Sequence, residues 1–334
     1  MSARTRLAIG AIGAMTAAGI LAGCGDAGSS GTEAPAAGAS GPGCAPVAGS
    51  ELIVLEDDKA LQNTDNIIPA INAKAANPEL IAALDKVSGA LDTPRLIGLN
   101  RAVNIERKTP RAVAEEFASA NNLTAGITET QSGSLVVGVA NFSESQTLGE
   151  LYRIVLTAAG YEVRVQQIGN RELYEPALEK GEIQVVPEYA ATLAEFLNGK
   201  VNGANPPEIS SPDLAKTTEG LRGVGESVGL AFGEPSPAQT QNAFAVTREF
   251  ADQNGVRTLS ELAEKCSGEA TVLGGPAECP QRPKCQVGLV EVYDFRAGSF
   301  SSLDAGGPLT QNALKQGEIS VGLVFSSDGS LATS

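Results

Sequence analysis

The chain has 334 residues, with 39 acidic and 24 basic side chains that give a formal net charge of −15 at pH 7, and it contains neither histidine nor tryptophan. The acidic balance, without a basic stripe interleaved with aromatic residues, argues against a nucleic-acid partner. The lack of histidine excludes the Ser-His-Asp and Cys-His triads and most zinc sites. We therefore expect a protein that is not an enzyme and that holds no metal and no cofactor.

Residues 1–23 have the features of a secretory signal peptide. Arg4 and Arg6 precede an apolar run, Leu7 to Leu21, that is short and glycine-rich for a membrane-spanning helix. The run ends in Leu-Ala-Gly-Cys24, which resembles the bacterial lipobox, where the cysteine is diacylated. We expect Cys24 to anchor the protein at the outer face of the cytoplasmic membrane. A buried or disulfide-bonded Cys24 behind an ordinary signal peptide is the alternative.

Residues 24–51 are composed almost entirely of Gly, Ala, Ser, Pro and Thr. Such a segment buries too little apolar surface to offset its ordering entropy, so we predict a flexible tether. The remaining part of the chain is long enough for two lobes but not for two large unrelated domains.

Four cysteines remain once Cys24 is assigned to lipid. An even number in an exported protein favours disulfides, and a site with four thiolate ligands for a metal is the alternative. Three pairings are possible for four cysteines. The short loop between Cys279 and Cys285 favours a local bridge, which leaves Cys44 to pair with Cys266.

The folded part begins with two apolar runs within residues 52–71, which we predict to be short strands. Three helices follow. Asn77-Pro78 starts the first, and Thr93 and Thr109, each followed by proline, are expected at the N-caps of the next two. Residues 126–134 are polar and contain glycine, as a linker would.

From residue 134 onward, strand and helix patterns alternate, which predicts an α/β fold with mainly parallel sheets. Two successive units of this kind suggest two lobes, with the ligand near the carboxyl ends of the strands. The predicted strands cover residues 135–139, 161–168, 183–186, 243–246, 271–273 and 319–325, and the predicted helices cover 146–159, 171–180, 191–198, 259–265 and 309–316.

Five motifs carry a family resemblance. They are Gly138-Val-Ala-Asn-Phe-Ser-Glu-Ser145, Gly181-Glu-Ile-Gln-Val-Val-Pro-Glu-Tyr-Ala-Ala-Thr192, Gly274-Gly-Pro-Ala-Glu-Cys279, Leu303-Asp-Ala-Gly-Gly-Pro-Leu-Thr310 and Phe325-Ser-Ser-Asp-Gly329. Together they resemble the glycine betaine/choline/carnitine substrate-binding proteins of osmoprotectant ABC transporters. The resemblance implies a two-lobed fold like that of type II periplasmic binding proteins.

The order of segments differs from that family, because the segment at residues 52–122, which ends the domain in relatives, comes first here. The resemblance therefore implies a circular permutant, cut at the hinge, with residues 123–133 joining the old ends. It places one lobe at 52–237 and the second lobe at 238–334. Within the first lobe, residues 134–237 correspond to the part that comes first in relatives. Only one covalent crossing between the lobes, near 233–241, is expected to remain, with the Cys44–Cys266 bridge replacing the lost one.

The resemblance also implies which residues bind the ligand. In relatives, tyrosines surround the quaternary ammonium, and Arg, Lys and Thr bind a carboxylate. Tyr189 is the expected cage residue and Thr192 a carboxylate donor. The remaining expected ligand-binding residues are Asn141, Ser143, Asn242, Arg282 and Thr310.

We therefore expect a monomeric, lipid-anchored receptor that closes over a small zwitterionic or quaternary ammonium solute and delivers it to an ABC permease in the membrane. Several expected cage tyrosines are replaced, for example by Thr310, so a receptor for a more polar, amino-acid-like solute is an alternative. A binding lipoprotein that signals to a membrane partner is another. Hinge closure is expected to draw its free energy from ligand contacts with both lobes.

Overall fold

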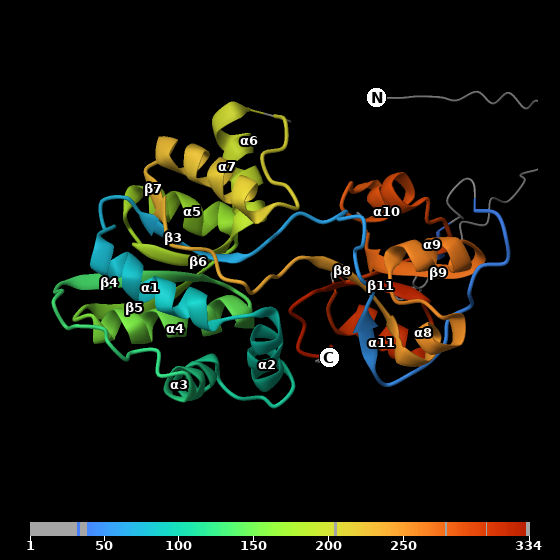
Figure 1. The fold of residues 1–334 in the computed structure, drawn as a ribbon, viewed down its shortest axis with the longest axis horizontal. Coiled ribbons are helices and arrows are strands. Elements are labelled where there is room, and N and C mark those ends of the chain that lie inside the picture. Colours follow the sequence, from blue (N-terminus) through green and yellow to red (C-terminus); the bar gives the residue numbers. More distant parts are fainter. Residues whose placement is uncertain (1–31, 34–38, 204–205, 278, 305, 332–334) are drawn as a thin grey trace, which may run out of the picture.

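The computed structural model describes residues 32–33, 39–203, 206–277, 279–304 and 306–331. They form two lobes, each built on its own β-sheet with helices on both faces, and two extended segments connect the lobes (Figure 1). The expected two-lobed α/β architecture is confirmed.

The first lobe has a five-stranded sheet in the order β5-β4-β6-β3-β7. Strand β4 runs parallel to β5 and β6, whereas β3 runs antiparallel to β6 and β7. The strands are β3 (Ile67–Asn72), β4 (Ser134–Ala140), β5 (Glu162–Gly169), β6 (Val185–Tyr189) and β7 (Leu230–Phe232).

Helices of the first lobe cover both faces of this sheet. One apolar core contains buried residues of α1 to α4, and another contains those of α5 to α7. The helices are α1 (Pro78–Ala90), α2 (Thr93–Asn104), α3 (Pro110–Ala120), α4 (Ser143–Ala158), α5 (Arg171–Lys180), α6 (Ala190–Asn202) and α7 (Leu214–Ser227).

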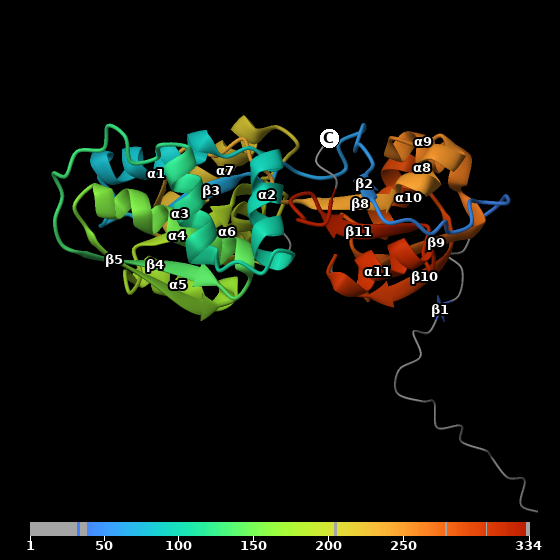
Figure 2. The ribbon, with the colours of Figure 1, turned by 90° about the horizontal axis from the view of Figure 1, so that it is seen from below.

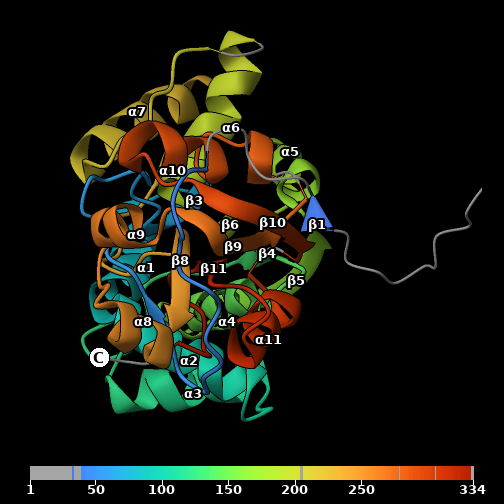
Figure 3. The same cartoon turned by 90° about the vertical axis from the view of Figure 1, so that its right-hand side faces the viewer.

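The second lobe has a six-stranded sheet in the order β1-β10-β9-β11-β8-β2, with β1 at its outer edge (Figure 2). Helices α8 and α9 lie on one side of this sheet and α11 on the other (Figure 3). The elements are β1 (Thr32–Glu33), β2 (Leu52–Val54), β8 (Asn242–Thr247), α8 (Arg248–Asn254), α9 (Leu259–Cys266), β9 (Gly268–Pro276), η1 (Cys279–Gln281), α10 (Gln286–Tyr293), β10 (Ala297–Leu303), α11 (Pro308–Gln316) and β11 (Val321–Phe325).

Strand β2 belongs to the second lobe, which corrects the expected boundary at residue 52. It pairs antiparallel with β8, and the buried side chain of Leu52 packs in an apolar cluster of the second lobe. The chain then crosses to the first lobe between Gln62, which donates to the Lys284 carbonyl, and Asn63, whose amide donates to Ser210 Oγ.

The lobes are therefore joined by two covalent crossings rather than one. The second covers residues 233–241 and lies antiparallel to the first: Asn66 pairs with Gln239, and the Thr240 amide donates to the Asp65 carbonyl at 3.0 Å. Hydrogen bonds between the crossings make the hinge a two-stranded connection.

The described part of the predicted tether packs on the second lobe, which is a second correction. Residues 39–51 run along the second lobe, where Thr247 Oγ1 donates to the Val47 carbonyl at 2.7 Å and the Gly49 amide donates to the Lys315 carbonyl at 3.1 Å. The Cys44–Cys266 and Cys279–Cys285 disulfides are both present, with Cα–Cα distances of 4.8 and 5.2 Å.

Both cysteines of the long-range bridge lie in the core of the second lobe. The Cys44–Cys266 bridge therefore does not span the hinge, and it cannot replace a lost crossing. It instead fixes the segment before β2 to the lobe that contains α9.

Candidate functional site: the cleft between the lobes

A cleft of about 1060 Å³ lies between the two lobes. Strands β4 and β6 are parallel, so their carboxyl ends, at Ala140 and Tyr189, meet at one edge of the first sheet. That edge faces the turn before α11 and the segment after β11, which line the cleft from the second lobe. The cleft is therefore placed where α/β sheets commonly bind ligands.

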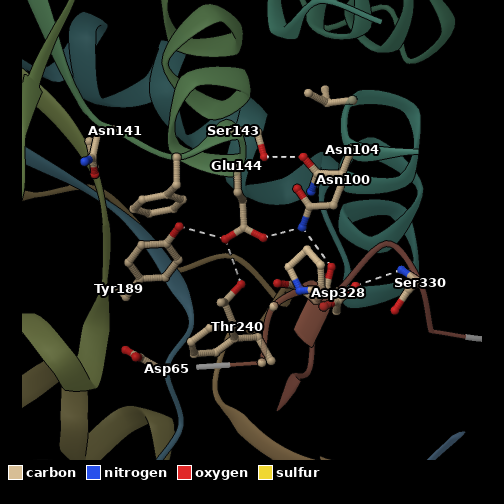
Figure 4. A pocket seen from close by; sticks show the side chains of 18 of the residues that line it. Asp65, Asn100, Asn104, Asn141, Ser143, Glu144, Tyr189, Thr240, Asp328 and Ser330 are labelled. Carbon is tan, nitrogen blue, oxygen red and sulfur yellow. Dashed lines mark hydrogen bonds between the residues drawn. The ribbon is translucent and has the colours of Figure 1, made fainter. Parts of the chain in front are cut away.

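Glu144 lies at the centre of the cleft, in the first turn of α4 (Figure 4). Its side chain is only 6% exposed. Oε1 accepts hydrogen bonds from Tyr189 Oη at 2.7 Å and Thr240 Oγ1 at 2.9 Å, and Oε2 accepts one from Asn100 Nδ2. These donors hold a buried carboxylate in a fixed position.

Asn100 also connects the two lobes without a covalent link. Its Nδ2 donates to the Ser327 carbonyl at 2.8 Å, and Ser327 follows β11 of the second lobe. On the next residue, Arg101 Nη2 donates to the Leu331 carbonyl at 2.7 Å. The segment after β11 therefore contacts α2, and its position is coupled to that of Glu144.

Aromatic side chains line the cleft from both lobes. The rings of Phe142 and Tyr189 have centroids 6.3 Å apart and planes tilted by 30°. Phe142 is 44% exposed, and Phe325, from the second lobe, is 38% exposed. Large apolar side chains exposed at a cleft offer their faces to a ligand, and a cation binds such faces through their quadrupoles.

A buried ion pair lies beside these rings. The Arg171 guanidinium donates from Nε and Nη2 to the Glu188 carboxylate at 2.8 and 2.7 Å, and Tyr174 Oη donates to Glu188 Oε1 at 2.9 Å. Burial opposes the charge of Arg171, but the Glu188 carboxylate raises the pKa of the guanidinium above its usual value. The pair fixes α5 to the end of β6.

Asp65, at the end of the first crossing, accepts hydrogen bonds from the amide and the hydroxyl of Thr192. Burial raises the pKa of the Asp65 carboxyl to about 6, against the hydrogen bonds from Thr192, which lower it. In the second lobe, burial likewise raises the pKa of Asp328, which accepts from the Ser330 amide at 2.8 Å.

Four of the expected ligand-binding residues line the cleft: Asn141, Ser143, Tyr189 and Thr192. Three of them, Ser143, Thr192 and Tyr189, already make side-chain hydrogen bonds within the protein. Ser143 Oγ donates to Asn104 Oδ1 at 2.7 Å, and the hydroxyl of Thr192 is bound to Asp65. Burial, and after it the Glu144 carboxylate, raise the pKa of Tyr189 above its usual value, so the phenol stays a donor to Glu144.

The other three, Asn242, Arg282 and Thr310, do not line the cleft. Thr310 is fully buried, and its Oγ1 donates to Asp304 Oδ1 at 2.8 Å, where it closes the turn before α11. Asn242 Nδ2 donates to the Lys284 carbonyl at 3.5 Å. Arg282 is exposed in the loop that the Cys279–Cys285 disulfide closes.

Sequence reasoning missed several cleft residues, of which some, such as Phe142 and Glu144, lie at a strand-to-helix turn and others lie elsewhere. The family motifs contain some of them, whereas Asp65, Asn100 and Thr240 come from a crossing or from the end of a helix. The missed lining residues include Asp65, Asn100, Phe142, Glu144, Arg171, Thr240, Gln311, Phe325 and Asp328.

Neither a membrane-spanning helix nor a metal cluster is found in the described part of the chain. No helix there is long and apolar enough to cross a membrane. Within the same residues, no group of three or more Cys, Asp or Glu side chains could hold a metal ion. The expected lipid attachment at Cys24 lies outside the described residues.

Comparisons with known proteins give one consistent family. A family model described as the substrate-binding domain of ABC-type glycine betaine transport systems matches residues 46–120 and 133–334. The chain is similar to a glycine-betaine-binding protein of Pseudomonas aeruginosa, at 25% identity over 64% of this chain and 68% of that protein. It is also similar to the glycine betaine-binding protein YehZ of Escherichia coli, at 23% identity over 59% of this chain and 65% of that one.

The aligned regions thus span about two thirds of the length of these curated relatives. Among solved structures, Haemophilus influenzae OppA is 13% identical, with a TM-score of 0.26 over 56% of this chain and 44% of that one. A score this low carries no argument about the fold, which follows from the two sheets themselves.

Proposed function

Because the chain belongs to the family of substrate-binding domains of ABC-type glycine betaine transport systems, we propose that it is a receptor that captures a small quaternary ammonium solute and delivers it to an ABC permease. The family consists of extracytoplasmic solute-binding proteins rather than enzymes. The observation that carries the proposal is the cleft between the lobes, in which the Tyr189 ring lies beside the exposed Phe142 ring and its hydroxyl binds the buried carboxylate of Glu144.

The chemistry of the ligand class fits this lining. A quaternary ammonium has no N–H donor and a diffuse charge, so it is bound by aromatic faces and nearby negative charge. Phe142 and Tyr189 offer such faces from the first lobe, and Phe325 offers one from the second. A ligand that contacts both lobes favours the closed state by its differential affinity, which is the free energy that closes the hinge.

We propose that Cys24 holds the receptor at the outer face of the cytoplasmic membrane. A cysteine after Leu-Ala-Gly at the end of an apolar run supports this attachment. A diacyl group supplies the two chains that stable anchoring requires. Intact-mass analysis of the protein purified from membranes tests it: a diacylated N-terminal cysteine is expected, and a protein that begins elsewhere contradicts the anchor.

A thermal-shift screen tests the ligand class. The panel is glycine betaine, choline, carnitine, ectoine and a set of amino acids, each added to the purified folded domain. A ligand at a hundred times its Kd stabilises the fold by about 2.7 kcal/mol. We expect stabilisation by quaternary ammonium compounds. Stabilisation by amino acids alone would leave a solute receptor but contradict the ligand class.

We also propose that the chain is a circular permutant of its family. The family model matches in two segments and leaves residues 121–132 between them unmatched. Leu331, the last described residue, pairs in parallel with Leu52, so the two ends that relatives would join lie side by side. Both features are expected if an ancestral connection was cut at this point and the old termini were joined through residues 123–133.

A further inference from the structure

The described residues that line the cleft carry an excess of negative charge. Three carboxylates belong to it, those of Asp65, Glu144 and Asp328, and two guanidinium groups, those of Arg107 and Arg171. The partner of Arg171 is a further carboxylate, that of Glu188. Four carboxylates against two guanidinium groups leave a formal charge of −2, in a site partly shielded from water.

The first of the two guanidinium groups, that of Arg171, is already paired. Arg171 binds both oxygens of Glu188, which is the fork-to-fork geometry that a ligand carboxylate would otherwise use. Glu188 is 1% exposed, so separating the pair would leave a buried charge without its partner. A ligand carboxylate would have to compete with this pair.

The second guanidinium lies at the margin. Arg107 follows the end of α2, has a left-handed backbone with φ of 63°, and is exposed to solvent. Attraction at such a site is screened by water and salt. Neither arginine therefore offers a desolvated, unpaired receptor for a carboxylate inside the cleft.

Glu144, in contrast, is placed to interact with a cation. Tyr189 Oη donates to Glu144 at 2.7 Å, so a cation on the face of the Tyr189 ring stands near this carboxylate. Oε1 of Glu144 accepts two hydrogen bonds and Oε2 one. A carboxylate oxygen has two lone pairs, so Oε2 retains the capacity to accept a hydroxyl of the ligand.

We propose that the cleft selects a quaternary ammonium cation without a carboxylate over a zwitterionic one, and that Glu144 determines this preference. The inference rests on the proposed function and narrows its ligand class. An added carboxylate in the ligand is repelled by Glu144, Asp65 and Asp328, and it meets no guanidinium group that is both desolvated and unpaired. A hydroxyl at the same position meets an acceptor.

Choline and glycine betaine test the proposal, because both carry a trimethylammonium group. Choline has a hydroxymethyl group where glycine betaine has a carboxylate. Isothermal titration calorimetry at pH 7.5 and low salt compares both ligands on the full folded domain. One carboxylate repelled at an effective dielectric constant near 20 corresponds to a difference of roughly tenfold or more in Kd. We expect choline to bind at least about tenfold more tightly.

Three variants connect the preference to its residues. Glu144→Gln is expected to weaken the binding of choline and to bring the ratio of the choline and glycine betaine affinities toward one. Asp65→Asn is expected to act in the same direction and is available if Glu144→Gln fails to fold. Glu226→Gln, on the exposed surface of α7 and outside the cleft, is the matched control and should leave both affinities unchanged.

The outcomes separate this proposal from the function that it refines. If glycine betaine binds as tightly as choline or more tightly, the preference is wrong and the receptor function stands. The preference is equally wrong if both variants fold and leave the ratio of affinities unchanged. If the folded protein binds no quaternary ammonium compound of the thermal-shift panel, the proposed ligand class fails together with the preference.

Discussion

At the scale of single residues, Tyr189 has two separable roles, because its ring lines the cleft while its hydroxyl binds Glu144. Tyr189→Phe keeps the ring and removes one buried hydrogen bond, for which we expect a loss of stability of about 1 kcal/mol. Tyr189→Ala also removes the aromatic face and is expected to cost about 0.5–2 kcal/mol of affinity for a quaternary ammonium.

Chemical denaturation measures the first effect of the Tyr189 variants, and calorimetric titration measures the second. Tyr161→Phe, at a buried tyrosine of the first lobe whose hydroxyl donates to Gln131, is the control for the loss of a phenol outside the cleft. Unchanged affinity in a folded Tyr189→Ala variant would show that the ligand does not contact this ring.

Asp65 gives the cleft a dependence on pH. Burial raises the pKa of Asp65 from 3.8 to about 6, the Thr192 hydrogen bonds and the Arg171 charge lower it, and the Glu188 charge raises it. Below about pH 6 Asp65 takes up a proton and its charge is lost, so we expect affinity for a cationic ligand to fall between pH 7.5 and 5. Titration calorimetry of wild type and Asp65→Asn measures this, and the variant should show a flatter profile.

The same shift has a consequence for stability in the ligand-free protein. The folded state binds the Asp65 proton more tightly than the unfolded state, so this group favours folding most at low pH, and that contribution is lost as pH rises from about 4 through 6. Asp65→Asn removes the cost of the buried charge and is expected to raise the unfolding temperature at pH 7.5. A lower unfolding temperature would contradict the assignment.

At the scale of elements, the Cys44–Cys266 bridge is expected to contribute stability but not to control the hinge. It closes a loop with a sequence separation of 222 residues, and the chain-entropy model gives up to about 5 kcal/mol for such a bridge. Because both cysteines lie in the core of the second lobe, the cleft should be unaffected by its loss.

The double variant Cys44→Ala/Cys266→Ala tests this separation by denaturation and by ligand titration. We expect a large loss of stability with an unchanged Kd. Cys279→Ala/Cys285→Ala, which opens a loop with a sequence separation of only 6, is the control and should lose less. A strong loss of ligand affinity in the first variant, with the fold intact, would indicate a role in closure after all.

Local sequence signals predicted the helices and strands better than they predicted the contacts between them. The Asn77 and Thr109 side chains cap α1 and α3 as expected, and proline occupies the first turn of each. For α2 the cap is Asp92 rather than Thr93, since the Asp92 carboxylate accepts from the Arg95 amide. The prediction of a side-chain cap at the start of α2 was right, but the capping residue is one position earlier than predicted.

Other elements and most of the cleft depend on long-range contacts. Helix α7 was not predicted, although its Asp213 cap is visible in the sequence. Glu144 reads as an ordinary acidic residue in the first turn of a helix, and only the fold brings Asn100 and Thr240 to it. Hydrogen bonds between residues so far apart have no local sequence signal.

At the scale of the whole molecule, the lobes are held by two paired crossings and by the segment after β11. The bridge between Asn66 and Gln239 pairs the crossings, and Asn100 holds the Ser327 carbonyl from the first lobe. If the chain is a permutant cut at the hinge, the lobes stay connected by two covalent segments and by the hydrogen bonds that Asn100 and Arg101 donate to carbonyls of the segment after β11. On that proposal, the cut does not free one lobe from the other.

If the chain is a permutant, the ancestral order should also fold. A chain that runs from Gly133 to Leu331, continues through about six glycine and serine residues, and then covers Leu52 to Ala125 restores that order with a flexible connection. The join is short because Leu331 and Leu52 are paired and both buried. Since every strand pairing of the two sheets from β2 to β11 is retained, we expect the same secondary structure and the same Kd for the solute.

The control keeps the present order but begins at Leu52, so that both chains lack residues 39–51, and both carry Cys266→Ala because Cys44 is absent from each. Circular dichroism and calorimetric titration then compare two chains that differ in little but the order of their segments. An ancestral-order chain that fails to fold, beside a control that folds and binds, would count against permutation. Equal affinity would show that ligand binding depends on the two paired crossings. It would not depend on where the chain is cut.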